Sequence, residues 1–299
     1  MKKALILAVA SSCLLLALSS AQAQPTTIYD DNFVNDSTLS SSYVNINNIN
    51  SAVQWAFTAN SQLQLTTAAS GKLDDLVGQF TPQTLSGAGQ FVTFTASFNS
   101  PSLTTSGSAG SILFALDNSG GNIFSPAPGP YNPTLTTGPT AAVTGGYLGM
   151  LGLNSTPKTS SKLYARTAAG TNDLSYYQQA GPDTALASGA SSVNLNTGDN
   201  FKVIFTVENI GGGQDTITGQ LYDATTSTAM DTYTTTTSVV PTSTFDTFDI
   251  GVYTGSEASG YNINLTDLNV IASVPEPSTF ALAGLGLGAV SFLRRLRRR

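Results

Sequence analysis

The alternation of apolar and polar side chains constrains the fold of this chain more than any other feature of its sequence. Phe201, Val203, Phe205 and Val207 occupy every second position of one stretch, and mostly polar residues fill the positions between them. This period of two is that of a β-strand with one buried face. No stretch between residues 24 and 273 has the 3.6-residue period of an amphipathic helix. The sequence therefore predicts an all-β fold.

Shorter alternating segments repeat along the chain, separated by turns rich in glycine, asparagine and serine. Ile263 and Leu265 lie on one phase of the last segment and Leu268 and Val270 on the other, so we expect a β-bulge near Thr266. Short strands with frequent turns are typical of an antiparallel β-sandwich. We expect strands at residues 28–33 (an edge strand), 53–58, 62–66, 92–98, 112–116, 201–208, 216–222, 248–252 and 262–271, with Phe94, Phe98, Phe114, Val203, Phe205 and Val207 buried.

The N-terminus has the three parts of a secretory signal peptide. Two lysines follow the initial methionine, residues 4–18 are apolar, and a small-x-small cleavage site ends at Ala23. We expect signal peptidase to cut between Ala23 and Gln24. The only cysteine, Cys13, leaves with this peptide, so no disulfide can stabilise the mature protein.

The mature domain is acidic and lacks histidine. Residues 24–273 contain five basic and 17 acidic side chains, which leaves a formal charge near −12. Such a surface repels nucleic acid, because phosphate backbones are bound through lysine and arginine. Without histidine or cysteine, Ser-His-Asp and Cys-His catalysis are excluded, and the commonest ligands of transition metals are missing. We expect no cofactor.

The C-terminus carries a second three-part signal. Pro275, Glu276 and Pro277 keep the chain extended, because proline lacks a backbone donor and fixes φ. An uncharged apolar segment follows from Phe280 to Leu293, and arginines that cannot cross a bilayer cheaply end the chain. These stop-transfer residues are Arg294, Arg295, Arg297, Arg298 and Arg299.

This ending resembles the PEP-CTERM sorting signal of bacterial envelope proteins. The resemblance covers residues 274–299, and its three parts occur in the expected order. It implies export through the inner membrane, a transient C-terminal membrane anchor, and processing by an exosortase. It also implies a final location at the cell surface or in the extracellular matrix, with a role connected to exopolysaccharide or biofilm.

The apolar segment is short for a membrane span. Its 14 residues would extend about 21 Å as a helix, against about 30 Å for the hydrocarbon core of a bilayer. Length alone favours a buried helix of a globular domain, which is the alternative. We expect a transmembrane helix, because the segment has no polar face and the flanking arginines, with Ser278 and Thr279, can extend its span.

A long proline-rich loop is expected at residues 117–146. After it, Gly145–Leu153 resembles the Gly-Gly-x-Leu-Gly strand of concanavalin-like lectin and laminin-G jelly rolls. The resemblance extends to the strands at 200–208, 216–223 and 262–271, and it implies a jelly-roll sandwich. Another β-sandwich is the alternative, since glycine-rich strands also arise where backbones pack closely.

The chain thus divides into a signal peptide (1–23), a β-sandwich domain (24–273) and a sorting and membrane segment (274–299).

Few side chains suggest catalysis or metal binding. Concanavalin-like glycosidases present closely spaced carboxylates on one strand, and no Glu-x-Asp pattern occurs here, so a glycoside hydrolase is the less favoured hypothesis.

Calcium is the one metal that the composition permits, since it binds oxygen ligands. Asp30 and Asp31 would lie near Asp267 if the first and last strands were neighbours, and Asp74–Asp75 is a second acidic pair. Aspartates in such a chain more often cap turns, so we expect no metal site.

Exposed aromatic rings would provide the contacts for a sugar. Tyr131 lies in the proline-rich loop, and Tyr176 and Tyr177 are adjacent, so on a strand one of these two must face outward. These three tyrosines are the candidate glycan contacts. Trp55, the only tryptophan, shares the apolar phase of its strand, and we expect it in the core.

The sequence supports three classes of function. We expect an exported, non-catalytic surface or matrix protein associated with exopolysaccharide. The alternative is a lectin-like carbohydrate-binding module, and the third class is a glycoside hydrolase. Saturable binding of one defined glycan by residues 24–273 would favour the second class, and turnover of a glycan the third.

The exported protein should begin at Gln24 and lack Arg294–Arg299, because both ends resemble cleaved signals. Intact-mass measurement of protein purified from the cell surface tests both cuts together. Precursor from a strain without exosortase provides the reference mass. An exported protein that keeps its arginine tail contradicts the prediction.

Overall fold

The computed structural model of the chain contains a β-sandwich, and Thr27–Ala272 form one compact unit. The other unit, residues 1–26 with 273–299, lies almost entirely outside the described residues, so both terminal helices stay predictions. Within the described residues, no helix is long and apolar enough to cross a bilayer. The structure describes residues 25–33, 43–47, 56–57, 63–66, 73–103, 110–121, 145–153, 161–167, 183–188, 193, 195, 198–254 and 261–273.

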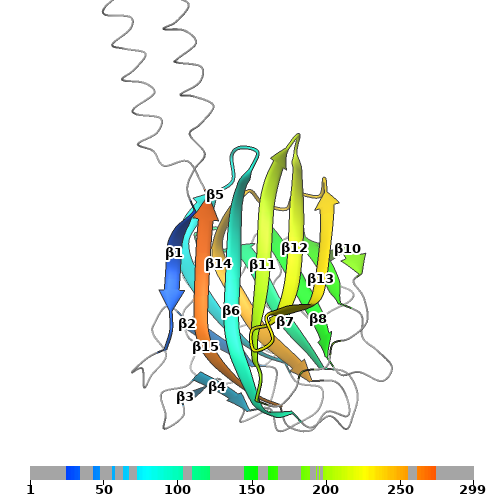
Figure 1. Cartoon of the computed structure of the whole chain (residues 1–299). Helices are drawn as coiled ribbons and strands as arrows, with labels where there is room; N and C mark the ends of the chain where they lie inside the picture. Colours follow the sequence, from blue (N-terminus) through cyan, green and yellow to red (C-terminus); the bar gives the residue numbers. More distant parts are fainter. Residues whose placement is uncertain are drawn as a thin grey trace, which may run out of the picture. The chain divides into compact units, whose positions relative to one another are not determined.

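The described strands build two antiparallel sheets that pack face to face (Figure 1). The eight-stranded sheet has the order β13-β12-β11-β6-β15-β4-β3, with β1 paired to β15. Its strands are β1 (Thr26–Asp31), β3 (Ala56–Phe57), β4 (Leu63–Thr66), β6 (Gln90–Leu103), β11 (Asn200–Gly211), β12 (Gln214–Asp223), β13 (Thr228–Thr237) and β15 (Tyr261–Ser273).

The seven-stranded sheet lies behind it in the view of Figure 1, with the order β10-β9-β8-β7-β14-β5-β2. Its strands are β2 (Tyr43–Asn47), β5 (Leu73–Thr84), β7 (Gly110–Asn118), β8 (Gly145–Leu153), β9 (Lys162–Arg166), β10 (Asp183–Ser188) and β14 (Thr244–Thr254). The loop predicted at 117–146 falls between β7 and β8, and residues 122–144 of it lie outside the described residues.

The chain crosses repeatedly between the sheets. Strands β5, β7 and β14 belong to the seven-stranded sheet, whereas β6 and β15, which follow β5 and β14 in sequence, belong to the other. This interleaving is characteristic of a jelly roll. The predicted antiparallel jelly-roll sandwich is therefore confirmed.

Aromatic rings join the two sheets through the core. Phe94 of β6 stacks on Phe248 of β14 with ring centroids 4.9 Å apart, and Phe205 of β11 meets Phe114 of β7 edge to face at 5.0 Å. All four rings are fully buried. The six side chains predicted to be buried are confirmed in the core: Phe94, Phe98, Phe114, Val203, Phe205 and Val207.

The phase of the last strand changes as the sequence predicts. Ile263 and Leu265 are buried, and so are Leu268 and Val270, although the two pairs differ in phase. The two residues between the pairs are both half-buried, which places the shift near Thr266. A single change of phase there lets β15 turn all four apolar side chains toward the core.

Three glycines in the strands make room for aromatic rings on the neighbouring strand. A Cβ at Gly149 would lie 2.0 Å from the Phe114 ring, and one at Gly78 would lie 2.3 Å from the Phe248 ring. A Cβ at Gly219 would likewise collide with a ring of β13. The register places each glycine directly opposite its aromatic partner. The glycine-rich strand β8 is thus explained partly by close packing.

Replacing Gly149 with alanine should destabilise the sandwich by about 1–3 kcal/mol, because the added methyl group must displace the Phe114 ring from a filled core. Urea unfolding followed by tryptophan fluorescence or circular dichroism measures the change. The matched control is Gly87→Ala, where the nearest atom to an added Cβ is 3.7 Å away. Equal stability of the two variants would contradict the packing described here.

Candidate functional site

Most site residues expected from the sequence lie outside the described residues, so their roles stay predictions. These residues are Ala23 and Gln24 at the signal cleavage site, Trp55, the tyrosines Tyr131, Tyr176 and Tyr177, and the C-terminal signal with Pro275, Glu276, Pro277, Phe280, Leu293, Arg294, Arg295, Arg297, Arg298 and Arg299.

The first and last strands bring together the acids considered for calcium. Burial raises the pKa of Asp267, and the neighbouring Asp30 and Asp31 carboxylates raise it further. Two of the carboxylates already have partners: Asp31 accepts a hydrogen bond from the Tyr43 hydroxyl over 2.7 Å, and Asp30 accepts one from Asn269 over 3.1 Å. Within the described chain, no three acidic groups lie close enough to hold a metal ion.

A hydrogen bond between a tyrosine and an aspartate ties the two sheets together. The Tyr147 hydroxyl of β8 donates to Asp215 Oδ2 of β12 over 2.7 Å. Burial raises the pKa of the Asp215 carboxyl, and the hydrogen bond from Tyr147 opposes this rise. Burial also raises the pKa of Tyr147, whose hydroxyl therefore remains a donor at neutral pH. The Asp215 carboxylate serves as an internal acceptor.

Three further buried carboxylates are acceptors for nearby turns and strands. Asp231 accepts a hydrogen bond from the Ser161 hydroxyl over 2.6 Å. Asp246 accepts from both the hydroxyl and the backbone N–H of Ser119, each over 2.6 Å. Backbone N–H groups of the following turn donate to Asp223 and lower its pKa. These acids are used to hold strand ends and turns.

The central part of the outer face of the seven-stranded sheet, which points away from the core, is buried as well. Phe114 points into the core, so its neighbours Leu113 and Ala115 must point to the other face. There Leu113 packs with Met150, and Ala115 packs with Leu148. All four are buried, although an antiparallel sheet commonly shows one face to water.

A row of acids crosses this buried outer face. Asp75 of β5, Asp249 of β14 and Asp117 of β7 lie on one phase, and each is at most 2% exposed. The strand ladders place Asp249 diagonally between the other two. Beyond Asp117 lie Gly146 of β8 and then the buried Arg166 of β9. We call Asp75, Asp117 and Asp249 the acidic row.

Asp249 is poorly compensated in its buried place in the acidic row. Neither of its carboxylate oxygens has a hydrogen-bond partner among the described residues. Burial raises its pKa well above the ordinary value, the Asp117 carboxylate adds to the rise, and Arg166 lowers it. Ionising such a buried group is costly. The row is closed to solvent and hence to a polymeric substrate.

The sequence reasoning missed this row because its members are far apart in the chain. Asp75 was considered only as part of the pair Asp74–Asp75, Asp249 lies in a strand assigned from its apolar positions, and Asp117 was placed at the start of the loop expected at 117–146. Strand phase is the signal that finds them, because Asp117 falls on the phase opposite to the core residues of β7. Gly146 is a further sign, since a Cβ there would collide with the Asp117 carboxylate.

The outer face of the eight-stranded sheet is open to solvent and rich in threonine. Side chains of β12 and β13 face each other there in three ranks, and each pair is hydrogen-bonded. The β13 members are exposed and the β12 members are half-buried. The ranks, which we call the threonine patch, are Thr216 with Thr236 (3.1 Å), Thr218 with Thr234 (3.1 Å) and Gln220 with Thr232 (2.9 Å).

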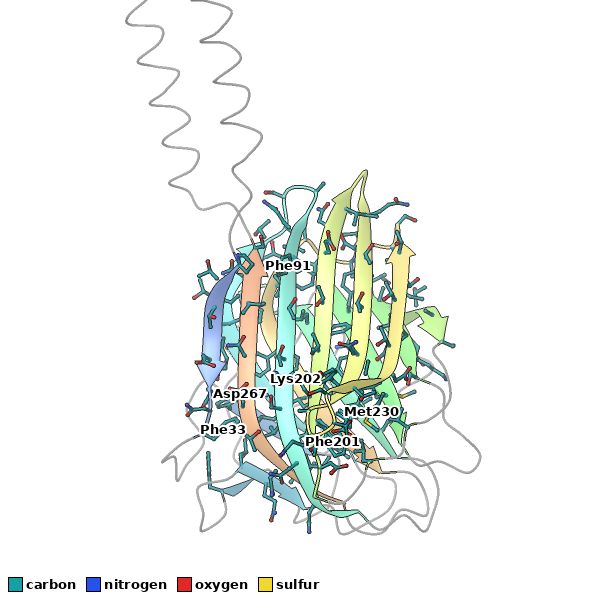
Figure 2. The ribbon with its side chains drawn as sticks, viewed as in Figure 1. Phe33, Phe91, Phe201, Lys202, Met230 and Asp267 are labelled. Carbon is teal, nitrogen blue, oxygen red and sulfur yellow. The ribbon has the colours of Figure 1, made fainter. Side chains whose placement is uncertain are left out.

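One rank of the patch continues across two more strands. Thr206 of β11 lies opposite Thr218, and Thr93 of β6 lies opposite Thr206. The hydroxyl oxygens of Thr93 and Thr206 are 2.8 Å apart. Threonines thus line up across four neighbouring strands. This face points to the viewer in Figure 2, where the labels Phe91 and Lys202 mark two ends of it.

The part of this face that β6, β11, β12 and β13 form carries almost no charge. Among the described residues that point outward from β6, β11, β12 and β13, the charged side chains are Lys202 and Glu208. Their charges cancel, whereas residues 24–273 as a whole carry about −12 from five basic and 17 acidic side chains. The acids of the domain are therefore concentrated elsewhere.

Replacing Asp249 with asparagine should stabilise the protein at neutral pH. A carboxyl with a raised pKa in the folded state binds more protons when folded, so stability falls as the pH rises above its ordinary value of 3.8. Asparagine has nearly the same shape and cannot ionise. The melting temperature of Asp249→Asn should exceed that of the wild type by a few degrees at pH 8, and the difference should shrink toward pH 4.

The matched control is Asp267→Asn, because this carboxyl is only partly buried and should give a smaller effect. Calorimetry across the pH range measures both variants. If Asp249→Asn were less stable than the wild type at pH 8, the Asp249 carboxylate would have to be ionised and well paired in the native protein.

Comparison with known proteins gives structural similarity at low sequence identity. The CBM2 module of the evolved Dit of Lactobacillus casei BL23 phage J-1 is 14% identical, with a TM-score of 0.44 over 86% of this chain and 100% of that one. Winged bean acidic lectin is 10% identical, with a TM-score of 0.45 over 85% and 100% of the two chains. The carbohydrate recognition domain of Emp47p is 10% identical, with a TM-score of 0.46 over 85% and 99%.

The sequence itself matches no curated protein. Residues 273–299 match the PEP-CTERM protein-sorting motif. The resemblance noted in the sequence is thereby confirmed, with a start one residue earlier than expected. The chain carries a PEP-CTERM sorting motif at its C-terminus, which marks it as an exported protein sorted by an exosortase.

Proposed function

We propose that this chain is a non-catalytic protein of the cell surface or extracellular matrix that associates with envelope polysaccharide. The sorting motif at residues 273–299 carries the proposal, because it begins at Ser273, the last residue of the closing strand β15. The sandwich is thus complete where the motif starts. When processing removes the sorting motif, the whole sandwich remains to act outside the membrane.

The chemistry of the sandwich supports a non-catalytic role. The mature chain contains no histidine or cysteine. Its buried carboxylates at Asp215, Asp231 and Asp246 accept hydrogen bonds from structural donors. The acidic row is sealed from solvent, so it offers no reacting group to a polymer. Among the described residues, β12 and β13 offer a surface of hydroxyl and amide groups.

Hydroxyl and amide groups suit weak contacts with a hydrated polymer. Each hydrogen bond exchanged with water contributes only about 0.5–1.5 kcal/mol, so a single site of this kind binds weakly. Sorting places many copies together at the cell envelope, and several weak contacts along one polymer then reinforce each other. In this proposal, retention depends on the sorting signal as well as on the sandwich.

Deleting residues 274–299 should release the protein into the medium while leaving the sandwich folded. We expect the fraction retained with cells and matrix to fall by at least about tenfold, because the copies are no longer concentrated at the envelope. Quantitative immunoblotting of matrix, cell and medium fractions measures retention, and circular dichroism checks the fold. Equal retention of the full and truncated chains would overturn the proposal.

A triple variant, Pro275→Ala/Glu276→Ala/Pro277→Ala, is the matched control, because it keeps the apolar segment and the arginines. It should remain in the membrane fraction without processing. Residues 24–273 should also be tested against purified glycans. Micromolar binding of one oligosaccharide would replace this proposal with the lectin alternative, and release of sugars from a glycan would show that the protein is an enzyme.

A further inference from the structure

We propose that the threonine patch is the surface with which this protein contacts an uncharged, extended polysaccharide chain. The inference rests on the proposed function and adds to it the contact surface and the class of polymer. Its first support is accessibility. The outer face of the seven-stranded sheet is buried over its central strands, whereas the β13 side of the eight-stranded sheet is exposed.

The hydroxyl groups of the patch keep free hydrogen-bonding capacity. A threonine hydroxyl has one donor and two acceptor lone pairs. The bond between Thr218 and Thr234 uses one donor and one lone pair, which leaves one donor and three lone pairs on this rank. The same holds for Thr216 and Thr236. A sugar hydroxyl is also both donor and acceptor, so it can bond to either member of a rank.

The spacing of the ranks suits a chain rather than a single small molecule. Side chains two residues apart on a strand are separated by about 6.6–6.8 Å, so the three ranks extend over about 13 Å. Tyr222 follows Gln220 on the same face of β12 and is half-buried. Its ring provides an apolar surface at the end of the ranks, where the C–H face of a sugar ring can pack.

The charge distribution favours an uncharged polymer. The four strands around the patch expose one lysine and one glutamate, so the patch attracts neither sign of charge. An acidic polymer would be repelled by the domain, which is near −12. For an uncharged polymer this repulsion does not arise, and binding should depend little on salt.

The test compares the wild type with Thr218→Val/Thr234→Val, using residues 24–273, whose sandwich is compact by itself. Valine keeps the branched shape that strands favour, and removing both partners of a hydrogen bond leaves neither one unsatisfied. The matched control is Thr84→Val/Thr244→Val. These two threonines form an exposed pair on the other sheet, with hydroxyl oxygens 2.9 Å apart.

Retardation in native gels that contain hydroxyethyl cellulose, an uncharged glucan, measures binding, and alginate serves as the acidic polymer. We expect retardation of the wild type by hydroxyethyl cellulose alone, unchanged between about 20 and 300 mM salt. The Thr218→Val/Thr234→Val variant should lose at least about threefold in apparent affinity. The control variant should bind like the wild type.

Several results would overturn the inference: no retardation by the uncharged polymer, retardation by alginate alone, or equal binding by both double variants. Light scattering gives one more contrary result. If the wild type were a dimer and Thr218→Val/Thr234→Val a monomer, the patch would be the contact with a second copy of the chain. The retention experiment separates the two proposals. If the full-length patch variant is retained in the matrix like the wild type, this inference fails and the proposed function stands.

Discussion

The aromatic contacts between the sheets are the interaction on which this structure depends. The mature chain has no cysteine, so no disulfide restrains it, and its charged side chains are few. Phe94 on Phe248 and Phe205 on Phe114 join the two layers near their centres. Glycines opposite these rings provide the volume that they fill. Stability therefore comes from shape complementarity between strands that are distant in sequence.

The two sheets differ in the faces that they turn away from this core. The seven-stranded sheet buries apolar side chains and the acidic row on its outer face, so its central strands have buried side chains on both faces. The eight-stranded sheet shows threonine and glutamine to water. Buried acids limit stability at neutral pH, whereas paired threonines do not. The buried acidic row thus belongs to the seven-stranded sheet, whereas the uncharged, accessible threonine patch lies on β12 and β13 of the other sheet.

The sequence predicted the fold wherever one face of a strand is buried and the other is not. Strand β11 alternates strictly, and its inward side chains are in the core as expected. Strand β5 was missed, because Leu76 and Val77 are both buried and no alternation results. Strand β13 was missed because its outward threonines and inward polar residues give little contrast.

The candidate surfaces were harder to predict than the strands. The threonine patch and the acidic row are each formed by residues on different strands. Which residues become neighbours depends on the register between those strands. Thr218 and Thr234 are close enough in sequence to be paired by inspection once both strands are known. Asp75 and Asp249 are separated by most of the domain, so only the completed sheet brings them together.

The place of the closing strand determines when folding can finish. β15 lies between β6 and β4 inside the eight-stranded sheet and also pairs with β1, so its partners are among the first strands of the chain. A chain exported from its N-terminus must wait for residues 261–273 before this gap in the sheet is filled. Until then β6 has an open edge, which is a hazard for aggregation. If the apolar segment predicted at 280–293 stops transfer, it does so just after this strand has crossed, and export would then determine when the last step of folding can occur.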